Sequence, residues 1–111
     1  MVNRKVQING AVTKLLSEVA GQLAAFLKNV LPSLFDDWWN KAVVNNLSFP
    51  QKRRLEEHNI TTLSGLDLAG LLRVLDQNWY QVSASLNLTS ESRHFVKEMQ
   101  TVRNRWAHAT T

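Results

Sequence analysis

The residues best suited to chemistry lie near the C-terminal end of the chain, in the motif R-N-x-x-x-H formed by Arg103, Asn104 and His108. On a helix with about 100° per residue, Asn104 and His108 share one face. This face lies opposite the apolar positions of the same segment, so packing does not explain His108. An imidazole suits proton transfer near neutral pH, which makes His108 a candidate catalytic residue. A solvated surface histidine is the alternative interpretation.

Arg103 lies at the edge of the apolar stripe of this segment. On an unbroken helix Arg103 and His108 diverge by about 140°, which is too far for both to hold one phosphate. Either the helix ends or bends between them, or a second copy of the chain completes the site. The stripe is expected to face the core, so Trp106 is interpreted as a core residue rather than a base-stacking platform. Its members are Phe95, Met99, Val102 and Trp106.

Helical periodicity runs through every long segment, and none alternates apolar and polar residues as a half-buried strand would. An apolar seam over Val12–Val30 predicts a first helix at about residues 10–31, ended by Pro32, which has no N–H to donate. The same seam suits coiled-coil pairing, although it is short for that, and bundle packing explains it as well. Ser33, with Asp36 three residues later, predicts the start of the second helix.

Three more helices are expected from capping signals and apolar seams. The third has Pro50 in its first turn, where a missing N–H does no harm. Five helices joined by short loops predict an all-α compact bundle that forms a single domain over residues 1–111. The expected limits are Ser48, with Gln51 completing a capping box, to about His58; Asp67, an N-cap, to Leu86; and Thr89–Ser90 onward.

The composition excludes several classes of protein. The chain has no cysteine, which excludes a disulfide scaffold, a thiolate zinc site and a cysteine nucleophile. Its apolar stretches are shorter than the roughly 20 residues that a membrane span needs. Lys14 and Glu18 interrupt the region that an export signal keeps uncharged, so we expect a cytoplasmic protein without membrane contact. There is no G-x4-G-K-S/T loop, so any ATPase activity would belong to another segment.

The chain carries a formal net charge of +4. A positive balance favours anionic partners, nucleic acid above all, because binding releases the counterions of the phosphate backbone. Many small proteins are equally basic and bind no nucleic acid, so charge alone does not decide the partner.

The R-N-x-x-x-H motif in a helical chain of this size resembles the HEPN superfamily. These domains are helical bundles marked by an arginine and a histidine about four to six residues apart, often with a polar residue directly after the arginine. Leu71–Trp79 and Val96–Gln100 are similar to one branch. That branch occurs in a transcript-surveillance endonuclease and at the N-terminus of large bacterial ATPases and helicase-like defence proteins. The resemblance covers about residues 30–111, and the first helix is generic.

The resemblance implies a metal-independent endoribonuclease that needs no cofactor. In such an enzyme His108 would act as the base for attack by a ribose 2′-OH, and Arg103 would stabilise the charge on the phosphate oxygens. Asn104 would orient the imidazole or the phosphate by hydrogen bonding. The resemblance also implies a homodimer in which two motifs face each other across a two-fold axis. Phage defence, a toxin–antitoxin system or a stress response is the expected setting, with an antitoxin or other regulator as a further partner.

Three more cations of the last helix are candidates for binding RNA. Arg93, Lys97 and Arg105 would guide the RNA backbone if they share the face of His108, and are solvated surface otherwise. His94 lies on the same helix, but about 21 Å from His108 by helix rise, so one site cannot contain both.

Other candidate features have structural explanations. The basic run at Lys52–Arg54 could contact phosphates, but Glu56 and Glu57 follow at once and favour local ion pairs. Trp38 and Trp39 could form a binding platform, but adjacent residues diverge on a helix, so one is expected in the core and the other at an interface. His58 is explained by its place near a helix C-terminus.

Two further hypotheses stand beside the ribonuclease. The chain could be a non-catalytic HEPN module for dimerisation or nucleic-acid binding within a larger ATPase or helicase-like protein, from which it would be an N-terminal piece. It could also be a helical adaptor in which the motif arose by chance.

Overall fold

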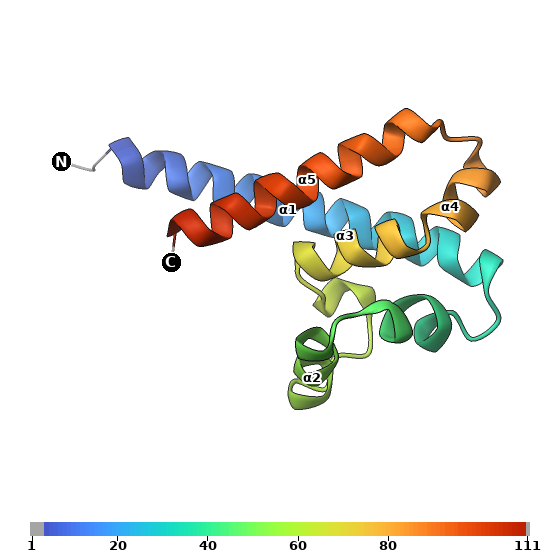
Figure 1. The fold of residues 1–111 in the computed structure, drawn as a ribbon. Coiled ribbons are helices and arrows are strands. Elements are labelled where there is room, and N and C mark those ends of the chain that lie inside the picture. The colour runs from blue at the N-terminus through green and yellow to red at the C-terminus, as the bar shows by residue number, and fades with distance from the viewer. Residues whose placement is uncertain (1–3, 111) are drawn as a thin grey trace.

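The computed structural model describes the backbone of residues 4–110 and the side chains of residues 10–106, and all regular structure in that part of the chain is helical. The all-α prediction is therefore confirmed. The two long helices run in opposite directions, and the N-terminal part of α1 and the C-terminal part of α5 extend beyond the shorter elements (Figure 1). The elements are α1 (Arg4–Leu34), η1 (Trp39–Val43), η2 (Val44–Asn46), α2 (Phe49–Glu57), η3 (Leu63–Gly65), α3 (Leu68–Gln77), α4 (Trp79–Leu86) and α5 (Ser90–Thr110).

The core is built around α3, which contacts α1, α4 and α5. Full burial of each apolar side chain stabilises the fold by about 1.5–3 kcal/mol relative to leaving it in water, so these contacts fix α3 in the centre. None of the helices between residues 4 and 110 is both long and apolar enough to cross a lipid bilayer. The most completely buried large side chains are Leu27, Leu31, Val43, Leu71, Leu72, Val74 and Val82.

The boundary between the first two predicted helices is wrong. Pro32 does not end α1, because the helix continues to Leu34 with the proline inside its last turn. Ser33 consequently belongs to α1, where its hydroxyl donates to the Val30 carbonyl at 2.7 Å instead of capping a new helix. The segment after the turn is a π-helical turn, η1, followed by the 3₁₀ turn η2, rather than a regular second helix.

The predicted fourth helix is divided into α3 and α4 at Asn78. The Asn78 side chain is buried, and its amide nitrogen donates to the carbonyls of Val74 and Ala42, at 2.7 and 2.8 Å. Because one of these bonds crosses to η1, the break in the helix also fastens the π-helical turn to the core. The segment Leu71–Trp79 therefore includes the break between α3 and α4.

Two predicted helix starts are confirmed. Ser48 caps α2 through a capping box, in which its backbone N–H donates to Gln51 Oε1 at 2.9 Å and its hydroxyl accepts from the Gln51 N–H. Asp67 caps α3 by accepting from the Gly70 N–H at 2.9 Å. The last helix begins at Ser90, as expected.

The orientation predicted for α5 is wrong. Its buried apolar residue is Val96, which is 6% exposed, whereas Phe95 and Val102 of the predicted core stripe are 66% and 58% exposed. Met99 is 37% exposed, and Trp106 is partly buried. The side of α5 that packs on α3 is mainly polar, and the exposed apolar stripe borders α3 only near Leu68.

Candidate functional site

Arg103 is held in place by a carboxylate at the N-terminus of α3. Its Nη2 lies 3.7 Å from Asp67 Oδ2, and the same oxygen lies 3.6 Å from Arg54 Nη1. The other oxygen of Asp67 accepts the capping bond from Gly70. The Arg103 side chain is 31% exposed, so the guanidinium is a partly buried, oriented cation that solvent still reaches. A phosphate bound to Arg103 would share the guanidinium with Asp67.

A polar groove of about 560 Å³ lies between α3 and α5 and has Arg103 on its wall. Polar side chains dominate its lining, and three of them are cations: Arg73, Lys97 and Arg103. Asn104 also lines this groove, so the structure brings two of the three motif residues to one place. The remaining lining residues are Gln51, Ala69, Leu72, Asp76, Gln77, Gln100 and Thr101.

Arg93 and Lys97 have a structural partner. Asp76 on α3 is 7% exposed, and its two oxygens lie 3.3 Å from Arg93 Nε and 2.8 Å from Lys97 Nζ. A buried carboxylate is costly unless it is paired, so these two cations offset the charge of Asp76. Their expected role in guiding RNA is untested, and the ion pairs explain both residues without it. Arg105, the third candidate, is exposed.

Position 108 belongs to α5, which continues without interruption from Ser90 to Thr110. The helix therefore does not end between Arg103 and His108. The side chain of His108 lies outside the described residues, so its expected role as the catalytic base stays a prediction.

The opposite side of α5 borders a second hollow, the apolar groove, which has a volume of about 310 Å³. It combines the exposed stripe of α5 with apolar residues of α1 and has a single charged member, Glu98, in its lining. A further hollow of about 530 Å³ between α1 and the start of α3 includes Trp106 and the other side of Arg103. The lining of the apolar groove is Leu15, Leu16, Val19, Leu68, Phe95, Glu98, Met99 and Val102.

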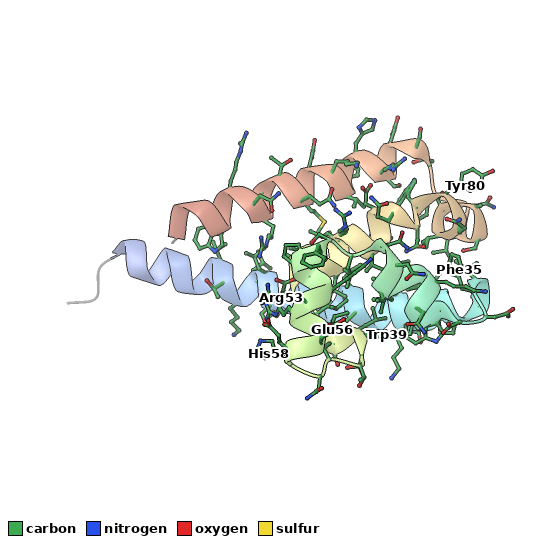
Figure 2. The ribbon with its side chains drawn as sticks, turned by 60° about the horizontal axis from the view of Figure 1, so that its bottom comes forward. Phe35, Trp39, Arg53, Glu56, His58 and Tyr80 are labelled. Carbon is green, nitrogen blue, oxygen red and sulfur yellow. The ribbon has the colours of Figure 1, made fainter. Side chains whose placement is uncertain are left out.

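The basic run of α2 forms ion pairs, as its neighbouring acidic residues suggest. Arg53 Nε lies 3.1 Å from Glu57 Oε1, one helical turn away, and Arg54 is shared with Asp67 as described above. Arg53, Glu56 and His58 lie at the surface of the α2 segment (Figure 2). His58 is the C-terminal cap residue of α2.

The remaining candidates do not form a site. The rings of Trp38 and Trp39 pack edge to face at 5.8 Å, and both are partly buried, so neither is wholly core nor a flat platform. His94 is exposed. Within the described part of the chain, no group of three or more His, Asp or Glu side chains could hold a metal ion.

The sequence interpretation missed three contributors to the polar groove. Gln77 lines it from α3 and Gln100 from α5, and Asp76 supplies the charge that orients Arg93 and Lys97. One signal was available for Asp76: a carboxylate inside the apolar seam of α3 needs cations, and Arg93 and Lys97 are four residues apart on the next long helix.

Comparison with models of protein families gives a match over most of the chain. The family model described as Swt1-like HEPN matches residues 14–111, a range that begins within α1 and includes all of α3, α4 and the motif. No curated protein and no solved structure matches the chain.

Proposed function

Because the chain belongs to the Swt1-like HEPN family, we propose that it is a metal-independent endoribonuclease with a site formed by Arg103, Asn104 and His108. The observation that carries the proposal is the setting of Arg103. Its guanidinium is partly buried, held by Asp67, and placed with Asn104 on the wall of a polar groove. A fixed cation beside a solvent-accessible groove is what a reacting phosphate requires.

The proposed reaction uses only the chain's own groups. His108 removes the proton of a ribose 2′-OH, whose oxygen attacks the adjacent phosphorus while the bond to the 5′-oxygen breaks. The products are a 2′,3′-cyclic phosphate and a 5′-hydroxyl, and the leaving oxygen receives a proton from a second acid. Arg103 stabilises the negative charge that develops on the phosphate oxygens, because its guanidinium keeps its charge and offers several donors.

We propose that the active form is a homodimer. Since α5 is a single helix through position 108, Arg103 and His108 diverge on its surface, and one chain presents half of a site. A two-fold related copy would supply a second histidine as the acid and a second arginine for the phosphate. We expect the protein to act on RNA in the cytoplasm, in a defence, toxin–antitoxin or stress-response system.

The decisive experiment measures cleavage of a labelled single-stranded RNA in excess chelator. We expect cleavage by the parent chain and a rate about 10²–10⁴-fold lower for His108→Ala, since general acid–base catalysis contributes this much. The cleavage rate of Arg103→Ala should be lower than that of the parent by a similar factor. Arg53→Ala is the matched control, because Arg53 is an exposed cation paired with Glu57 on another helix, and it should cleave like the parent. Equal rates for the parent and His108→Ala would overturn the proposal.

A second function, a non-catalytic HEPN module that docks within a larger polypeptide, has support from one observation. Phe95, Met99 and Val102 form an exposed apolar stripe, and contiguous apolar surface of this kind marks interaction sites. The absence of cleavage by the parent chain at every concentration in a dilution series, with RNA binding or self-association retained, would favour this module.

A further inference from the structure

The polar groove has a cation on its wall at each end, Arg103 and Lys97. Near Arg103 and Asn104 the groove has a cation whose carboxylate partner, Asp67, is not part of its lining. Near Lys97 two cations, Lys97 and Arg93, share the single carboxylate of Asp76, so this end of the groove also keeps a positive charge. Lys97 and Arg103 are six residues apart, or about 9 Å along the helix. With the reacting phosphate at Arg103, the rest of the groove is open to the adjoining nucleotide.

Two amide side chains also line this groove. Gln77 of α3 and Gln100 of α5 line it from opposite sides, and neither makes a hydrogen bond to another of the described residues. Each amide offers a donor and an acceptor side by side, the arrangement that pairs with the edge of a nucleobase. Arg73, fixed by its 2.7 Å bond from Nε to the Asn46 carbonyl, borders the same groove.

The size of the groove suits a small ligand. Its volume of about 560 Å³ lies within the range of roughly 300–1,000 Å³ that is usual for small-molecule sites. Sequence-specific recognition of RNA targets unpaired bases, whose edges are free to meet polar side chains. A single unpaired nucleotide therefore matches both the dimensions and the chemistry of the groove.

We propose that the polar groove binds the unpaired base adjacent to the phosphate at Arg103, with Gln77 and Gln100 as specificity-determining residues. This proposal rests on the proposed function, since it places the reacting phosphate at Arg103. Asp76 acts as a positioning residue in this arrangement, because it holds Lys97 at the wall of the groove. The consequence is that cleavage depends on the identity of one base beside the cut.

The test compares base preference in the parent, in Gln77→Ala/Gln100→Ala and in a matched control, Gln22→Ala/Gln81→Ala. The control removes two exposed amides on α1 and α4 outside the groove. Cleavage of an RNA library with randomised positions should show about a tenfold preference at one position beside the cut for the parent and the control. The groove variant should lose most of this preference and keep the parent's unfolding midpoint. An unchanged preference in the groove variant, or cleavage by the parent without any base preference, would overturn the subsite.

A second measurement separates this proposal from the catalytic one. 2′-O-methyl RNA lacks the attacking hydroxyl, so affinity for short oligomers of each base can be measured by fluorescence anisotropy without cleavage. The spread of affinities among the bases should shrink in Gln77→Ala/Gln100→Ala and persist in His108→Ala. If the parent discriminates among bases but cuts no RNA, the groove proposal stands as a binding site and catalysis fails. If the parent cuts RNA and the groove variant keeps its base preference, catalysis stands and the subsite fails.

Discussion

The two sides of α5 differ in what they leave exposed. Toward α3, Arg93 and Lys97 are bound to a buried carboxylate, and Gln100 and Asn104 line a polar groove. Toward α1, the stripe that contains Phe95 and Val102 lies exposed beside an apolar groove. The polar side is thus packed on α3 around Asp76 and open to solvent at Asn104, whereas the apolar stripe is exposed beside its own groove.

This difference shows that ion pairing, as well as apolar burial, decides how α5 lies on the core. Asp76 fixes the rotation of the helix through two cations, and Arg103 lies near Asp67 in this rotation. By helical spacing position 108 shares a face with Asn104, on the polar side. A second copy that completes the active site would therefore approach this side, and not the apolar stripe.

The largest expected effect on stability comes from removing the two cations that pair with Asp76. In Arg93→Ala/Lys97→Ala, Asp76 keeps its buried position and loses both of its cations. Leaving a buried charge unpaired costs about 3–5 kcal/mol, so we expect the free energy of unfolding to fall by about 3 kcal/mol. Urea denaturation, monitored by circular dichroism, would measure this change in the free energy of unfolding.

The matched control adds Asp76→Asn to the same double variant. An amide carries no charge, so most of the lost stability should return if the unpaired carboxylate is the cause. Failure of this third substitution to restore stability would show that the two long side chains stabilise α5 by packing rather than by their charge.

A smaller effect is expected at Asp67, where the cap and the ion pairs can be separated. Asp67→Ala removes the bond from Gly70 and should cost about 1 kcal/mol of stability. Asp67→Asn retains a good N-cap and should be close to the parent, because ion pairs with partly exposed arginines contribute little. With its competing carboxylate gone, Asp67→Asn should bind 2′-O-methyl RNA about threefold more tightly. Equal losses of stability for both substitutions would contradict the assignment of the cap.

Local signals in the sequence predicted local structure well. The capping box at Ser48 and the cap at Asp67 depend on residues three positions apart, so the sequence contains all of the information. The break at Asn78 was not predicted, because its buried amide bonds to the Ala42 carbonyl, which is distant along the chain. Pro32 likewise has no local signal that distinguishes a helix end from a last turn.

The candidate site was predicted in part for the same reason. Residue types and spacing identified Arg103 and Asn104, and the structure places both on the polar groove. The orientation of α5 was wrong because an apolar stripe was assumed to face the core, whereas exposed apolar residues are common on folded proteins. The partner that sets the orientation, Asp76, belongs to another helix.

The smallest expected effect is on the apolar side. Val102 is 58% exposed and far from the polar groove on the helix surface, so Val102→Glu should change the free energy of unfolding by less than about 0.5 kcal/mol. If the active dimer forms through the polar side, this variant should also keep the parent's mass in solution and its rate of RNA cleavage. Leu86→Glu, which replaces an exposed apolar residue on α4, is the control for the added charge. Light scattering and cleavage across a dilution series would check both. If Val102→Glu has half the parent's mass in solution and Leu86→Glu keeps the parent's mass, the apolar stripe is the dimer interface. If Val102→Glu also loses cleavage, the catalytic dimer forms through the side of α5 opposite to Asn104.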